Sequence, residues 1–209
     1  MDDISGRILL TYTKSFLEEV ASIASQIDVN SVDKVAEAIA VVKVNGGRLF
    51  FAGSGGGAGH ASHATCDFRK LGGIESYCIS DNVSELTARI NDQSWEDSYV
   101  EWLKASRFSS NDGVFIFSVG GGDAERKVSM QLVNVVDYAA SLGATIVGVV
   151  GRDGGHLAKK ATASVVVPVV NPSNVTTQVE GFQAVVWHLV IGHPSIGAAK
   201  PHWESIASL

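Results

Sequence analysis

Four side chains have the types and spacings needed to bind a metal ion or move protons: His63, Asp67, Glu180 and His188. His63 and Asp67 lie four residues apart in a segment of helical composition, so they share one face of a predicted helix. Glu180 and His188 lie on a second predicted helix, eight residues or about 12 Å of rise apart. Two imidazoles and two carboxylates suit Zn²⁺, and Fe or Mn are also compatible. Spacing alone leaves two alternatives open: His188 could be a buried core histidine, and Glu180 could be a solvent-exposed charge on its helix.

Two glycine-rich segments are of the kind that binds anions. The apolar run 48–52 leads into glycine-rich residues 53–59 and then into a helix, so free N–H groups at the helix start would face an anion, most often a phosphate. The run 113–118 leads into a second glycine turn, after which Asp123 is the expected cap of a helix. A plain strand-to-helix turn is the alternative for each segment. The candidate anion-binding residues are Ser54, Gly55, Gly56, Gly57, Ser118, Gly120 and Gly121.

The elements that must position these residues alternate between strand and helix from residue 48 onward. Several of the strand segments are almost entirely apolar, which is typical of parallel strands buried on both faces. In such a sheet, ligands bind at the carboxyl ends of the strands where the strand order reverses, so the two glycine segments would form one pocket. The predicted strands are 48–52, 76–79, 113–118, 145–150 and 164–169. The predicted helices are 58–70, 84–91, 95–105, 124–142, 155–161 and 176–192.

Two further helices are predicted before the first strand. The first covers 4–28, and the second covers about 31–45 with a cap at Ser31 or Asn30. They must pack either on the sheet or on another subunit. With no linker or internal repeat, we expect one domain over 1–209, in which 1–46 is a helical extension in an oligomer interface. The apolar face of the first helix consists of Ile8, Leu9, Tyr12, Phe16, Val20, Ile23 and Ile27.

Composition narrows the functional class. The chain has 209 residues, of which 45% are apolar and 18% charged, enough for one well-packed α/β domain. A net charge of −6 gives no support for nucleic acid as a partner. The two cysteines are not in a CxxC pair, the first residues are acidic where a signal peptide is basic, and no apolar run reaches membrane-spanning length. We therefore expect a cytoplasmic protein that does not bind membranes.

Taken together, these motifs resemble the SIS (sugar isomerase) domain, specifically the sedoheptulose-7-phosphate isomerase (phosphoheptose isomerase) family. The resemblance covers nearly the whole chain and includes the loop 53–58 with His63 downstream, Asn91-Asp92, the segment 151–155 and the last helix near His188. It implies a doubly wound, five-stranded parallel sheet and a homotetramer with active sites at subunit interfaces.

The resemblance also implies an activity. Sedoheptulose 7-phosphate would be converted to a D-glycero-D-manno-heptose 7-phosphate through an enediolate, for heptose nucleotide biosynthesis. It places a zinc-binding histidine on His63, the catalytic base on Asp67 and the catalytic acid on His188. The implied metal ligands are His63, Asp67, Glu180 and His188. When the glycine-rich segments are included, the expected substrate-binding residues are Ser54, Gly55, Gly56, Gly57, Ser84, Asn91, Asp92, Ser118, Gly120, Gly121, Asp123 and Glu180.

The chain departs from the family pattern around the phosphate. After Ser118 the family's Thr-Ser-Gly-Asn-Ser is replaced by Val-Gly-Gly-Gly-Asp, and Gly57 stands where the family has serine. A carboxylate at Asp123 would repel a phosphate, so either the phosphate lies off the helix axis on glycine amides, or Asp123 turns away and a cation compensates. Alternatively, the anion of the ligand lies elsewhere and Asp123 binds a sugar hydroxyl. Two alternatives remain open: a non-catalytic SIS module that binds a phosphosugar or a partner protein, and an isomerase of another phosphosugar. The candidate cations are Arg69, Arg126 and Lys127, with the helix start at Ser84 as a further anion site.

Overall fold

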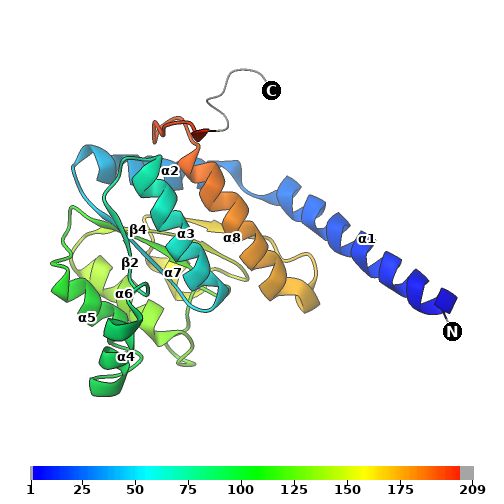
Figure 1. The fold of residues 1–209 in the computed structure, drawn as a ribbon, viewed down its shortest axis with the longest axis horizontal. Helices are drawn as coiled ribbons and strands as arrows, with labels where there is room; N and C mark the ends of the chain where they lie inside the picture. Colours follow the sequence, from blue (N-terminus) through cyan, green and yellow to red (C-terminus); the bar gives the residue numbers. More distant parts are fainter. Residues whose placement is uncertain (1, 203–209) are drawn as a thin grey trace.

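A parallel sheet with the strand order β2-β1-β3-β4-β5 forms the centre of the fold in the computed structural model (Figure 1). The model describes the backbone of residues 2–202 and the side chains of residues 11–202. The sheet confirms the predicted α/β class and all five predicted strands. Their bounds are β1 Leu49–Gly53, β2 Ser76–Cys78, β3 Gly113–Phe117, β4 Thr145–Val150 and β5 Ala163–Val166.

Helices cover both faces of the sheet and bury its apolar side chains. One core layer joins α2, α3 and α8 to the sheet face that carries Phe51, Phe115 and Phe117. The other joins α5, α6 and α7 to the face that carries Phe50 and Ile116. Successive residues of β1 and β3 thus point to opposite layers, and both strands are fully buried. The helices and their bounds are α1 Asp2–Gln26, α2 Val29–Val44, α3 Gly56–Lys70, α4 Val83–Asp92, α5 Ser98–Ala105, α6 Met130–Ser141, α7 Gly155–Lys160, η1 Pro172–Asn174 and α8 Val175–Ile191.

The two leading helices have different roles. Helix α2 packs in the core, whereas α1 extends beyond the sheet and contributes only Ile23 of its described side chains to the buried core (Figure 1). The extension of 1–46 into an oligomer interface stays a prediction. The cap of α2 is Asp28, not Ser31 or Asn30, because the Asp28 carboxylate accepts the Asn30 N–H. Glu19 anchors the second half of α1 by accepting hydrogen bonds from three side-chain amides near the start of α8. Within the described part of α1, Tyr12 and Leu17 are 60% and 61% exposed; the Ile8 and Leu9 side chains lie outside the described residues.

The predicted helix 124–142 with Asp123 as its cap is wrong at its start. Helix α6 begins at Met130, and its cap is Ser129, in the left-handed region with φ 54°. The residues between form a tight antiparallel turn in which Asp123 and Val128 exchange backbone hydrogen bonds of 3.0 and 2.9 Å. The Asp123 carboxylate accepts the N–H groups of the next residues in this turn, at 3.0 and 2.9 Å. This local bonding competes successfully with helix formation.

No helix in the described part of the chain combines the length and the apolar character needed to cross a bilayer. The two thiols, Cys66 and Cys78, are both free.

Candidate active site

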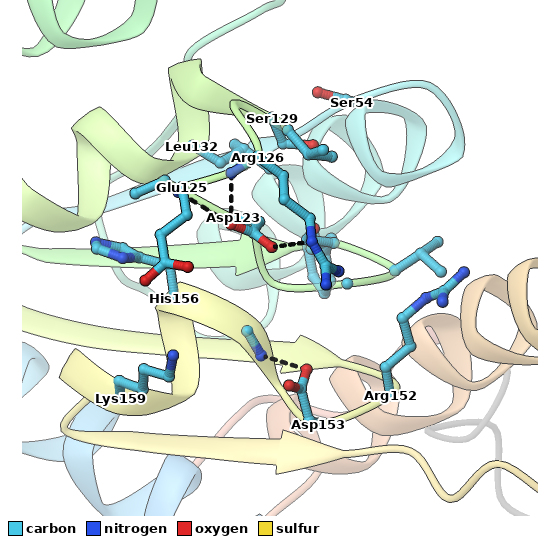
Figure 2. A pocket seen from close by; sticks show the side chains of 18 of the residues that line it. Ser54, Asp123, Glu125, Arg126, Ser129, Leu132, Arg152, Asp153, His156 and Lys159 are labelled. Carbon is cyan, nitrogen blue, oxygen red and sulfur yellow. Dashed lines mark hydrogen bonds and ion pairs between the residues drawn. The ribbon is translucent and has the colours of Figure 1, made fainter.

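A cavity of about 660 Å³ opens at the carboxyl ends of the central strands (Figure 2). Ser54 lines it just after β1, Ser118 just after β3, and Arg152 just after β4. The strand order reverses between β1 and β3, which is where open α/β sheets bind ligands. The second glycine-rich segment thus lines the cavity with Ser118, Gly120 and Gly122, whereas the first contributes only Ser54. The predicted anion-binding glycines 55, 56, 57 and 121 are not among the lining residues.

Glycine is required in these loops because backbones approach each other closely. A Cβ atom at Gly57 would lie 2.7 Å from the Phe117 carbonyl oxygen, so a serine there would force α3 away from β3. At Gly121, where φ is +72°, a Cβ atom would lie 2.0 Å from the Gly154 carbonyl oxygen. Gly57, which stands where the family has serine, thus has a packing reason, and Gly121 matches the family's own glycine. Gly120 also replaces a family serine, but a Cβ atom there would meet only the Arg152 side chain, with its Cδ at an ordinary 3.7 Å.

Three serine hydroxyls surround the cavity: Ser54, Ser118 and Ser129. The Ser118 Oγ accepts the Gly121 N–H at 3.1 Å, and the Ser54 Oγ accepts a hydrogen bond from the Gln131 Nε2. Each of these two oxygens is held by a donor, so its own hydrogen is left to donate. Hydroxyls in this state suit an anionic ligand.

Sequence analysis missed Ser129 and Gln131 because it started the helix at residue 124. A signal was present in the sequence. Ser129 directly precedes the apolar periodic run of 130–141, which is the position of a helix N-cap.

Charged side chains line the outer part of the cavity. Arg126 lies 3.7 Å from Asp123 (Nε to Oδ2), and Figure 2 shows the side chains of Arg126 and Arg152 approaching from two different loops. The Arg126 backbone N–H, the Glu125 N–H and the charges of Arg126 and Lys159 hold the pKa of Asp123 below its ordinary value. Asp123 is therefore already bonded within its own turn.

The other predicted cations are not in the cavity wall. Arg69 donates to the Ser76 carbonyl at 2.7 Å and lies over the Tyr77 ring, and Lys127 is not among the lining residues. The Arg152–Gly155 segment is a turn in which the Gly155 N–H donates to the Asp153 carboxylate, and it also forms part of the cavity wall.

A second polar cluster lies where α3 packs on α8. One ligand atom each from His63, Asp67 and His188 lies within 4.8 Å of the other two. The His63 Nε2 is 3.9 Å from the Asp67 Oδ2. The His188 Nδ1 is 2.7 Å from the Ala184 carbonyl oxygen; this contact places the proton on Nδ1 and leaves the Nε2 lone pair free. Two imidazole nitrogens and a carboxylate oxygen form a donor set that can hold a divalent metal.

Glu180 does not belong to this group of three. Its carboxylate lies at the start of α3, where a Cβ atom on Gly56 would be 2.6 Å from it. His60, which sequence analysis overlooked, lies on α3 one turn before His63, with its ring edge-on to the Phe117 ring at 6.0 Å. Burial lowers the pKa of His60, and Glu180 opposes this effect. The polar face of α3 thus extends from the helix start to Asp67.

Three predicted substrate-binding residues lie on α4, away from the cavity wall. The Ser84 N–H is bonded by the Asn82 side chain, which caps the helix. The Asn91 side chain donates to Asp92 at 2.7 Å, and both are exposed. None of the three lines the cavity in the described chain.

Comparisons with known proteins place this geometry in context. No family profile matches the chain. It is 31% identical over 159 residues to the lincomycin biosynthesis protein LmbN of Streptomyces lincolnensis, a match that covers 71% of this chain but only 56% of that protein. It is 28% identical over 187 residues to a phosphoheptose isomerase of Shewanella denitrificans, covering 87% of this chain and 90% of that protein. Among solved structures, a phosphoheptose isomerase from Neisseria gonorrhoeae superimposes with a TM-score of 0.74 at 21% identity, covering 90% of this chain and 98% of that one.

Proposed function

The chain is an SIS-domain protein related to the phosphoheptose isomerases, and from this premise we propose that it is an aldose–ketose isomerase. Its proposed reaction converts sedoheptulose 7-phosphate to a D-glycero-D-manno-heptose 7-phosphate, a step toward heptose nucleotides. The observation that carries the proposal is the grouping of His63, Asp67 and His188. A module that only binds a phosphosugar has no use for an acid, a base and metal ligands in one place.

The reaction needs a base and an acid that act at the neighbouring sugar carbons C1 and C2. A base removes a proton from C1, next to the C2 carbonyl, to give an enediolate, and a proton is then delivered to C2 while C1 becomes the aldehyde. We assign the base to the Asp67 carboxylate. His188 carries protons to and from the sugar oxygens through Nε2, since its Nδ1 is bonded to the backbone.

A zinc ion fits the donor set of His63 and Asp67, with the His188 Nε2 as a third ligand only while that nitrogen carries no proton. Bound there, it would act as a Lewis acid toward the two sugar oxygens. Glu180 is assigned to the substrate rather than to the metal, because its carboxylate lies at the start of α3.

The substrate phosphate is assigned to the cavity. Its proposed donors are the hydroxyls of Ser54, Ser118 and Ser129, of which Ser129 stands at the N-terminus of α6. The Gly121 amide is not among the proposed phosphate donors, because it already donates to the Ser118 Oγ. Arg126 and Arg152 supply positive charge at the outer wall.

The proposed assembly is a homotetramer in the cytoplasm. The exposed apolar side chains of α1, such as Tyr12 and Leu17, support an interface between copies of this chain. The free thiols Cys66 and Cys78 support a reducing compartment.

The decisive experiment follows the proton. Protein purified without chelator is incubated with sedoheptulose 7-phosphate in D₂O. Product formation, deuterium at C2 of the aldose and deuterium at C1 of the recovered ketose are measured by NMR. An isomerase forms the aldose, and exchange of the abstracted proton with solvent places deuterium at C2 of the product and, through the reverse reaction, at C1 of the ketose. Binding of the sugar phosphate without product or exchange would identify a non-catalytic module, and turnover of a different ketose phosphate in parallel would change the assigned substrate.

A further inference from the structure

One polar side chain beside the cavity is buried in a way that fold stability does not explain. Gln131, on the first turn of α6, is 1% exposed, and the other buried residues of this helix are all apolar. Its Nε2 donates to the Ser54 Oγ, whereas its Oε1 has no hydrogen-bond partner among the described residues. A buried acceptor without a partner destabilises a fold, and an apolar side chain of the same size avoids that cost. We therefore look for the role of Gln131 in its hydrogen bond to Ser54.

That contact determines what Ser54 can do. The hydroxyl of Ser54 accepts the Gln131 N–H and lines the cavity. It donates to no protein atom in the described chain, so its hydrogen is free for a ligand atom that accepts. Ser118 is held in the same way by the Gly121 N–H, at 3.1 Å. Both hydroxyls thus have a hydrogen available to donate, which matches the oxygens of an anion.

We propose that Gln131 is a positioning residue, which fixes the Ser54 hydroxyl as a hydrogen-bond donor to an anionic oxygen of the substrate. Only the identity of that substrate, a phosphosugar, rests on the proposed function. The hydrogen bond joins α6 to the end of β1 across 77 residues of sequence, so it also holds the start of α6 against the first glycine loop.

A double-mutant cycle tests this assignment. The proteins are the wild type, Ser54→Ala, Gln131→Met and the double variant, and the probe is inorganic phosphate, titrated by calorimetry. The matched control is Gln183→Met. Gln183 is also fully buried with an unpaired Oε1, but its Nε2 faces the Val149 carbonyl oxygen at 3.4 Å and not a cavity hydroxyl.

Gln131→Met should weaken phosphate binding about tenfold when Ser54 is present, the loss expected for one hydrogen bond to a charged group. In the Ser54→Ala background the same change should have less than about a twofold effect, because the group it positions is gone. The melting temperature should stay unchanged or rise. Gln183→Met should leave phosphate affinity unchanged.

Equal losses in both backgrounds, no loss in either, or a wild-type protein that binds no phosphate would each overturn the assignment. If Gln131→Met does not fold, Gln131→Glu replaces it in the same cycle, since a carboxylate accepts the Ser54 hydrogen and withdraws it from the ligand. Turnover of sedoheptulose 7-phosphate is measured separately. Coupled phosphate binding without turnover refutes the isomerase and keeps the role of Gln131, whereas turnover with additive losses refutes only that role.

Discussion

The His63→Ala variant separates metal binding from the stability of the fold. The His63 side chain is 62% exposed, and its packing consists mainly of edge-on contacts with the Trp187 ring at 4.9 Å and the His188 ring at 5.6 Å. Loss of an exposed side chain with such contacts should lower the free energy of unfolding of the metal-free protein by about 1 kcal/mol or less.

The effect on metal affinity should be much larger. The group offers three protein ligands, so the variant loses one of the three. Changes in residues that merely orient a ligand weaken metal sites about 10- to 100-fold, and loss of a ligand itself should cost at least about 100-fold, or about 2.7 kcal/mol. Saturating zinc should therefore raise the melting temperature of the wild type and leave that of the variant almost unchanged.

Metal content is measured by mass spectrometry after purification without chelator, and zinc affinity by calorimetry. His193→Ala is the matched control, because His193 bonds Ser195 and pairs with Asp33 outside the cluster. Its metal content should equal that of the wild type. Equal zinc affinity in the wild type and in His63→Ala, or no metal binding by either, would refute the site.

Three further predictions concern catalysis, stability and assembly. Asp67→Asn and His188→Gln should each lower kcat about 100-fold or more in folded protein, and a loss within tenfold in either would remove that residue from the mechanism. Asp112→Asn should lower the free energy of unfolding by about 2–3 kcal/mol in denaturant titrations, because it leaves Arg48, 26% exposed, without the carboxylate it contacts at 2.8 Å. Burial raises the pKa of Asp112, but hydrogen bonds from Arg48 and Ser109 outweigh this effect and hold the pKa below its ordinary value. This stabilisation is therefore present above about pH 4 and is lost as the pH falls through the lowered pKa, so the deficit of the variant should shrink in acid. Light scattering should show a tetramer that Leu17→Glu weakens, and a wild-type monomer at micromolar concentration would contradict the assembly.

The sheet could be predicted from the sequence because its signals are local. Runs such as 113–117 and 145–150 are apolar at every position or nearly so, and a strand that alternates its side chains between two buried layers requires this composition. The glycine turns after 52 and 118 predicted the sheet edge at which the cavity lies for a similar reason, since close backbone contacts exclude a Cβ atom. The pair His63 and Asp67 was also predictable, because helical geometry brings residues four apart together.

Contacts between residues on different helices and strands were decided by the tertiary structure. The sequence placed Glu180 and His188 on one helix, but only the packing of α3 on α8 brings His188 to the metal-type cluster and Glu180 to the start of α3. The start of α6 depended on a turn in which the Asp123 carboxylate accepts two backbone N–H groups. Helix periodicity does not reveal that these hydrogen bonds compete with helix formation. The contact between Ser54 and Gln131 had no sequence signal, because no repeat or spacing relates residues on separate elements. Spacing along one helix determines relative position through a fixed geometry, whereas positions across elements follow from how the whole core packs.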